Sequence, residues 1–216
     1  MEKTLPSLNE LHLLNHPFYR DWMEGKLTRE QLRDYAGQYS VHVDAFPRYL
    51  GAIHANCADP ATRRILLENL NDEEGVTHGE PHPVLWRKFA AAMGADCEGV
   101  EGREAIQGVK NTFFECARSS LAEGLGALYA YEWQVPEIAK SKIEGLKARY
   151  GVEAEEALAF FEAHKTADIY HRDALRAVID ALPAAEKAKA EAAAERAARS
   201  LWDFLSDVHA RNQAAA

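Results

Sequence analysis

Two histidines and one aspartate in the C-terminal third could bind a metal ion. In His164-x-x-x-Asp168-x-x-His171 the spacings of three, four and seven residues fall on one face of an α-helix. Imidazole and carboxylate groups suit iron, manganese or zinc. The same face carries apolar residues typical of a bundle interior, namely Leu158, Phe161, Leu175 and Val178. The pattern therefore predicts three buried polar groups, satisfied either by a metal ion or by a simple His–Asp hydrogen bond.

A second buried carboxylate is expected at Glu132. It interrupts an apolar helical face whose other positions are Leu121, Leu125, Leu128, Val135 and Ala139. Pro136 lacks the N–H that would bond the carbonyl of Glu132, so we expect the helix to loosen there. An unpaired Glu at this position would be strongly destabilising. It could bind a metal, or it could pair with an Arg or Lys across the bundle.

The stretch of residues 71–86 combines four carboxylates with two histidines around a turn between helices. Glu73, at the end of one helix, and His82, near the start of the next, could converge across this turn. Glu74 and His78 form an alternative pair at i and i+4 if the first helix continues. Acidic turns of this kind are also common as solvated surface.

Together these elements supply carboxylates and histidines from four helices. That inventory is close to the ligand set of a non-haem di-iron carboxylate bundle. Such a centre binds and activates O₂, while the protein supplies geometry and a dry pocket.

The bulk properties narrow the class of protein. The 216 residues fit one domain, residues 1–216, and the formal charge of −9 disfavours nucleic acid as a partner. No apolar run reaches the roughly 20 residues that cross a bilayer, and Met1-Glu2-Lys3-Thr4 does not resemble a signal peptide, so we expect a cytoplasmic protein without a membrane partner. Cys57, Cys97 and Cys116 are widely spaced and are expected to be reduced.

The elements that must position these groups are predicted to be helices throughout, in an all-α bundle of about seven to eight helices. Thr28 with Gln31 resembles a capping box, and Pro47 should kink or interrupt the helix that it opens. The last segment is rich in Ala, Glu, Lys and Arg, but apolar residues near its end favour an ordered closing helix. The expected helices span residues 29–57, 60–74, 83–93, 102–119, 121–150, 152–181 and 184–212.

Several motifs resemble those of the haem-oxygenase-like di-metal oxidases, which include a chlamydial protein that associates with death domains. The resemblance covers residues 10–208 and implies a haem-oxygenase-like fold of the TenA and PqqC type. It is carried by His16-Pro17-Phe18-Tyr19 through Trp22, Leu27-Thr28-x-Glu30-Gln31-Leu32, Ala45-Phe46-Pro47-x-Tyr49-Leu50, Asn69-Leu70-x-Asp72-Glu73-Glu74, Tyr131-Glu132 and His164-x-x-x-Asp168-x-x-His171.

The resemblance implies a complete ligand set for two metal ions, iron with iron or iron with manganese. The implied ligands are Glu73, His82, Glu132, His164, Asp168 and His171. The loop between Glu73 and His82 is two residues longer than in the chlamydial relative, so His78 could substitute for His82.

The resemblance further implies O₂-dependent formation of para-aminobenzoate for folate synthesis, with an external reductant. The protein is then its own substrate: Tyr19 matches the tyrosine that gives up its ring, and Lys142 matches the suspected amine donor. Ten residues of straight helix from Glu132 span about 15 Å, so Lys142 is expected to reach the substrate ring rather than the metals. Further phenols are expected near the centre, available for radical relay: Tyr35, Tyr39, Tyr131 and Tyr170.

Other functions are compatible with parts of this pattern. A di-metal oxidase could act on an external small molecule, and the association of a relative with death domains suggests a helical protein-interaction module. Thiaminase-type hydrolases have a related fold but need a nucleophilic cysteine in the pocket, and none of the three cysteines falls near the ligand positions. A homodimer is expected in each case.

Overall fold

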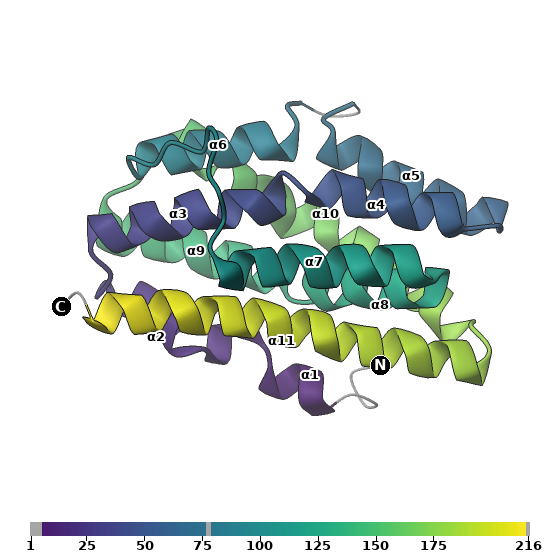
Figure 1. Ribbon diagram of the computed structural model, residues 1–216. Helices are drawn as coiled ribbons and strands as arrows, with labels where there is room; N and C mark the ends of the chain where they lie inside the picture. Colours follow the sequence, from purple (N-terminus) through teal and green to yellow (C-terminus); the bar gives the residue numbers. More distant parts are fainter. Residues whose placement is uncertain (1–5, 77–78, 215–216) are drawn as a thin grey trace.

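The computed structural model describes residues 6–76 and 79–214, and the side chains of all of these except 6, 7 and 166–168. Over the described residues the chain is helical and contains no strand, which confirms the all-α prediction (Figure 1). The elements are α1 (Pro6–Glu10), η1 (Leu13–Asn15), α2 (Pro17–Glu24), α3 (Arg29–Val43), α4 (Phe46–Asn56), α5 (Pro60–Glu73), α6 (His82–Ala92), α7 (Glu104–Ser119), α8 (Leu121–Glu132), α9 (Val135–Tyr150), α10 (Glu155–Asp180) and α11 (Ala184–Ala214).

The predicted capping box opens α3. The Thr28 hydroxyl accepts a hydrogen bond from the Gln31 backbone N–H at 3.2 Å, and the Gln31 side chain accepts one from the Thr28 N–H at 2.8 Å. The helix expected over residues 29–57 is two helices, because α3 ends at Val43 and Pro47 occupies the first turn of α4. Proline is favoured there since the first turn needs no N–H donor. The interruption predicted at Pro47 is therefore confirmed.

The helix expected over residues 121–150 is also broken. It ends at Glu132, and α9 begins at Val135 with Pro136 in its first turn. The loosening expected from Pro136 is thus a full break, which ends one helix at the buried carboxylate and redirects the chain after it.

No helix was expected before Arg29, yet α1, η1 and α2 form there. The His16 side chain accepts a hydrogen bond from the Phe18 N–H at 3.1 Å, and Pro17 begins α2. These are local start signals of a short helix. Phe18, Tyr19 and Trp22 bury its inner face.

The longest helix, α11, runs along one side of the molecule and packs mainly on α8 and α7 (Figure 1). On the other side α10 packs on α9, α6 and α8. The expected docking of the closing helix is confirmed, since Leu201, Phe204, Leu205 and Val208 are buried. Among the described residues, none of the helices has the length and apolar character needed to span a membrane.

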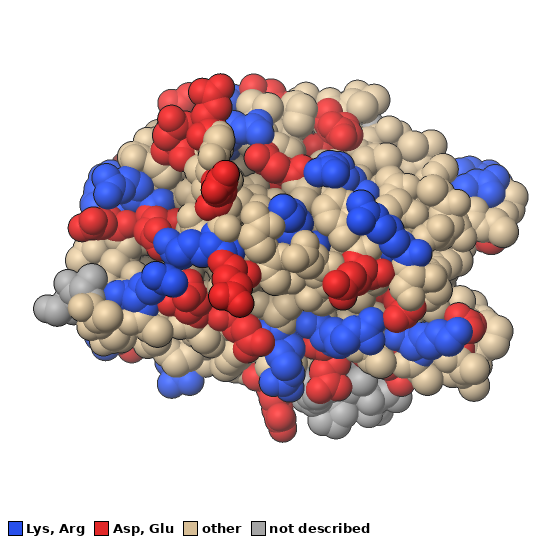
Figure 2. Space-filling model, in the orientation of Figure 1, with Lys and Arg blue, Asp and Glu red and all other residues tan. Residues whose placement is uncertain are grey.

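Acidic and basic side chains are interspersed over the face that Figure 2 shows. On α11 the basic groups form ion pairs, as expected of a solvated helix face rather than a phosphate-binding stripe. The pairs are Lys187 with Asp180, Lys189 with Glu186, Arg196 with Glu123, Arg199 with Glu195 and Arg211 with Asp207.

Candidate metal centre

Glu73, His82 and His164 converge from three helices. Glu73 is the last residue of α5, His82 is the first residue of α6, and His164 lies within α10. All three are buried, and one ligand atom of each lies within 4.8 Å of the others. Nδ1 of His82 is 3.0 Å from Oε2 of Glu73, and Nε2 of His164 is 3.9 Å from Oε1. Buried oxygen and nitrogen donors at this spacing could share one metal ion.

Glu132 ends α8 beside this group and is 2 % exposed. The Asn69 side-chain amide donates a hydrogen bond to Oε1 of Glu132 at 2.5 Å. Burial raises the pKa of Glu132 to about 8; the Asn69 hydrogen bond opposes this shift and the charge of Glu73 adds to it. The electrostatic influence of Glu73 indicates that the two carboxyl groups share one buried region, as a two-metal centre requires.

His171 is buried on α10, and its Nε2 lies 3.0 Å from Oδ2 of Asp72. Asp72 belongs to the acidic stretch around the turn, but sequence reasoning gave it no role. Its place one residue before Glu73, and three residues after Asn69, was the pattern that could have revealed it. Of the two acidic neighbours, Glu73 is buried and Glu74 is exposed, so the structure brings Glu73 to the centre.

Two of the expected positions lie outside what is described. The backbone of Asp168 belongs to α10, but its side chain is outside the described residues, and His78 is outside them altogether. Five of the six expected ligands are therefore placed by the structure, and all five gather at the ends of α5, α6 and α8 and along α10.

Two buried atoms without a partner test whether these residues suit a metal. Glu132 Oε2 and His171 Nδ1 are buried and have no hydrogen-bond partner, whereas His82 Nδ1 faces the Glu73 carboxylate. Each unsatisfied atom costs about 1–3 kcal/mol. A cation would satisfy both atoms, so the donor set fits a metal centre.

The pKa values of His164 and His171 also suit metal binding, which needs neutral imidazole. Burial, followed by the charge of His82, holds the pKa of His164 well below its ordinary value. Burial lowers the pKa of His171, although Asp72 opposes the shift. For His82, burial lowers the pKa but the Glu73 carboxylate outweighs it, and the net shift is upward.

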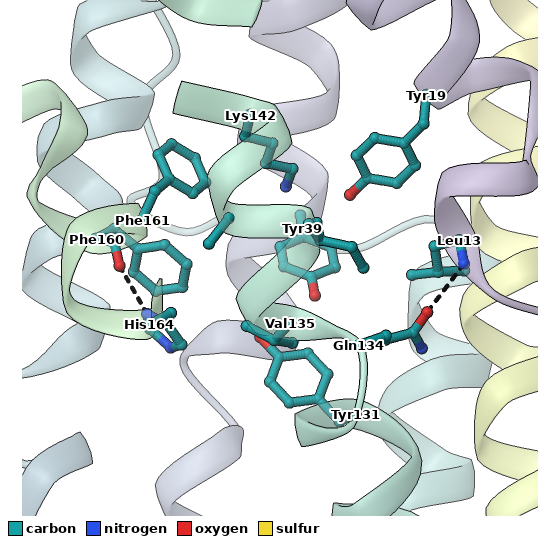
Figure 3. Close-up of a pocket in the computed structure, with 12 residues that line it drawn as sticks. Leu13, Tyr19, Tyr39, Tyr131, Gln134, Val135, Lys142, Phe160, Phe161 and His164 are labelled. Carbon is teal, nitrogen blue, oxygen red and sulfur yellow. Dashed lines mark hydrogen bonds between the residues drawn. The ribbon is translucent and has the colours of Figure 1, made fainter. Parts of the chain in front are cut away.

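A small cavity adjoins the metal-ligand group. Figure 3 shows the Lys142 amine and the Tyr19 hydroxyl pointing into the same space, with Tyr39, Tyr131 and His164 around it. Its volume is about 20 Å³. That is room for about one molecule the size of water. An aromatic substrate from outside does not fit into the cavity as it stands.

Lys142 and Tyr19 are linked through Tyr35. The Lys142 amine donates a hydrogen bond to the Tyr35 hydroxyl at 2.6 Å, and Tyr35 is hydrogen-bonded to Tyr19. The amine lies 5.6 Å from the centre of the Tyr19 ring. Burial lowers the pKa of Lys142 to about 7 and raises that of Tyr19 above its ordinary value.

The straight-helix distance from Glu132 to Lys142 does not apply, because the chain breaks at residues 133–134. Lys142 still reaches the Tyr19 ring, as expected, and its charge also acts on His164. Among the other phenols, Tyr35 and Tyr39 are buried and Tyr131 lines the cavity. Tyr170 contacts the ring of the candidate ligand His171, with 5.7 Å between ring centres, but it does not line the cavity: it is 59 % exposed and donates to Glu68 on the surface, because adjacent helical residues point about 100° apart.

All three cysteines are described, and none lines the cavity. Cys57 donates to a backbone carbonyl of the chain, and Cys116 is hydrogen-bonded to Arg196. A thiaminase-type nucleophile is therefore absent from the cavity lining.

The haem-oxygenase-like family of iron-containing redox enzymes matches residues 33–203, and the chain belongs to this family. The chain is 44 % identical over 214 residues to a 4-aminobenzoate synthase of Nitrosomonas europaea, covering 92 % of this chain and 86 % of that protein. It is 41 % identical over 199 residues to a 4-aminobenzoate synthase of Chlamydia trachomatis, covering 90 % of this chain and 85 % of that protein.

Solved structures support the fold. A protein of unknown function with a haem-oxygenase-like fold from Shewanella denitrificans superposes with a TM-score of 0.81 at 16 % identity, over 98 % of this chain and 91 % of that one. A CADD-like protein of unknown function from Nostoc punctiforme superposes with a TM-score of 0.75 at 18 % identity, over 98 % of this chain and 99 % of that one. The expected haem-oxygenase-like fold is confirmed.

Proposed function

We propose that this protein is a 4-aminobenzoate synthase that uses two metal ions and O₂ and takes the aromatic ring from its own Tyr19. The names of the relatives that are 41–44 % identical support the product. The single observation that carries the internal substrate is the cavity, which is too small for an external ring and has Tyr19 in its wall.

The proposed metal ligands are Glu73, His82, Glu132, His164, Asp168 and His171. Support comes from the buried group of Glu73, His82 and His164 and from the buried atoms of Glu132 and His171 that lack a partner. The chemistry supplied by a bound pair of iron ions, or of iron with manganese, is the activation of O₂ with electrons from an external reductant.

The chain's own residues prepare the ring and the amine. With a pKa of about 7, Lys142 is partly neutral at physiological pH, so that its nitrogen lone pair is available as the proposed amine donor. Tyr35 holds that nitrogen and the Tyr19 hydroxyl in one hydrogen-bonded chain. Apolar walls such as Phe160 and Phe161 keep water from the site.

The test is to produce the protein with ring-labelled tyrosine, load it with iron, supply O₂ and a chemical reductant, and analyse 4-aminobenzoate by mass spectrometry. We expect labelled product, at most one molecule per chain, and none from Tyr19→Phe protein. Tyr150→Phe is the matched control, because Tyr150 lies outside the cavity and donates only to backbone carbonyls of α2. It should retain full yield.

Two other results would redirect the assignment. A full yield of 4-aminobenzoate from Tyr19→Phe protein would rule out Tyr19 as the source of the ring, but it would leave the proposed oxidase activity standing. Many turnovers per chain, with unlabelled product from an added small molecule, would identify an external substrate instead.

A further inference from the structure

Near its C-terminal end, α5 carries one candidate ligand and two polar residues that contact candidate ligands on other helices. Asp72 and Glu73 lie three and four residues after Asn69, so each of them neighbours Asn69 on the surface of the last turns of this helix. Glu73 is a candidate ligand. Asn69 is 4 % exposed and contacts Glu132 on α8, whereas the Asp72 side chain is 30 % exposed and contacts His171 on α10.

Each of these contacts occupies one of the two polar atoms of a candidate ligand. Asn69 donates to Oε1 of Glu132, and Nε2–H of His171 donates to Asp72. In both ligands the other atom, Oε2 of Glu132 and Nδ1 of His171, is buried without a partner. In each of these two ligands, one polar atom is therefore hydrogen-bonded and the other is left available to bind a metal ion.

His164 follows the same rule with a backbone partner. Its Nδ1–H donates to the Phe160 carbonyl at 2.7 Å, which leaves Nε2 directed toward Glu73. Three ligands from two helices thus share one arrangement, in which a residue that is not a ligand takes the outer polar atom. A histidine whose second nitrogen donates to a carboxylate or a carbonyl is fixed in ring orientation and tautomer and is a more basic ligand.

We propose that Asn69 and Asp72 are positioning residues that select the ligating atoms, so that Glu132 binds metal through Oε2 and His171 binds through Nδ1. This inference rests on the proposed metal centre. Neither residue touches the metals. Asp72 acts through the His171 ring, and Asn69 acts through the Glu132 carboxylate.

The first measurement needs no substitution. The whole protein, with histidine labelled with ¹⁵N and loaded with Zn²⁺, reports by long-range ¹H–¹⁵N correlation which nitrogen of each ring carries a proton and which binds the ion. We expect His171 to bind through Nδ1 with Nε2 protonated, and His164 to bind through Nε2. Coordination of His171 through Nε2 would overturn the proposal.

The second measurement is the affinity for Co²⁺, followed by its visible absorption. Asp72→Ala and Asn69→Ala should each weaken binding by about 10- to 100-fold. Asp72→Asn keeps an acceptor oxygen and should restore most of the affinity and the His171 tautomer. Glu68→Ala is the matched control, since Glu68 also lies on α5 and accepts a hydrogen bond from α10, through Tyr170, but does so on the surface.

The outcomes separate this inference from the function on which it rests. If wild-type protein binds neither Co²⁺ nor Zn²⁺, the metal centre itself fails. If wild-type protein binds both ions, but Asp72→Ala and Asn69→Ala bind them as tightly as Glu68→Ala does, the metal centre stands and the positioning role is wrong.

Discussion

Lys142 is surrounded by aromatic rings rather than by acidic groups. Its amine lies 4.7 to 5.7 Å from the centres of six rings, contributed by Tyr19, Trp22, Tyr35, Tyr39, Trp86 and Phe161. Ring faces attract a cation, but burial penalises the charged form more strongly, and the pKa falls to about 7. The site therefore keeps a lysine in a form that can act as an amine.

Replacing this lysine by the apolar Lys142→Met should abolish 4-aminobenzoate formation and stabilise the fold. The gain should depend on pH. Below pH 7 the wild-type lysine is charged in both states and its burial is most costly. Between pH 7 and 10.5 the unfolded chain retains a proton that the folded chain has lost, so wild-type stability rises with pH.

Urea denaturation at pH 6 and pH 9 measures this difference. The free energy of unfolding of Lys142→Met should exceed that of wild type at pH 6, and this difference should be smaller at pH 9 by on the order of 2 kcal/mol. If the difference in free energy of unfolding is the same at pH 6 and pH 9, the pKa of Lys142 is not lowered in the folded protein.

At the scale of the elements, small residues let α8 and α11 approach closely. The Ala-rich part of α11, whose composition could also suit a disordered tail, turns its small residues inward, at Ala190, Ala193, Ala194, Ala197 and Ala198. Opposite them, a Cβ added at Gly126 of α8 would overlap the backbone carbonyl of Ala190. The two backbones thus meet at this crossing.

Gly126→Ala should destabilise the protein by about 2–3 kcal/mol, because neither backbone can yield without separating the helices. The matched control is Gly108→Ala in α7, where an added Cβ meets no atom within 4 Å. Helix propensity there favours alanine by about 0.5–1 kcal/mol. Chemical denaturation of both variants gives the two free energies of unfolding. Equal effects would contradict the close α8–α11 approach.

At the scale of the whole molecule, the metal centre should tie the consecutive helices α5 and α6 to α8 and α10, which come later in the sequence. α5, α6, α8 and α10 each contribute at least one candidate ligand. Metal binding to the folded state alone should therefore stabilise the entire fold by mass action, about 2.7 kcal/mol at a concentration 100 times the dissociation constant.

Thermal unfolding with and without Fe²⁺ under anaerobic conditions checks this coupling. Metal should raise the midpoint by several degrees, and a chelator should reverse the shift. His164→Ala should lose the shift, while His54→Ala, a half-buried residue of α4 away from the centre, should keep it. If the unfolding midpoint of the wild-type protein does not change when Fe²⁺ is added, the proposed ligand set is contradicted. The single domain, the homodimer and the cytoplasmic location expected from the sequence stay predictions.

The sequence by itself determined the helical class, most helix starts and the positions of Glu132 and His164 among apolar neighbours. These features are local, because helical periodicity and capping depend on residues within a few turns. The helix breaks at Pro47 and Pro136 could also be predicted from local sequence. At Pro136, however, the sequence predicted a loosened helix, and the structure has a complete break.

Only the tertiary structure decided which polar groups meet. The choice of Glu73 over its neighbour Glu74, the contacts of Asn69 and Asp72, and the outward direction of Tyr170 depend on how each helix is rotated against the others. That rotation is set by packing between segments up to about a hundred residues apart in the chain. Spacing along one helix can say that side chains share a face, but burial by other helices fixes which face lies inside.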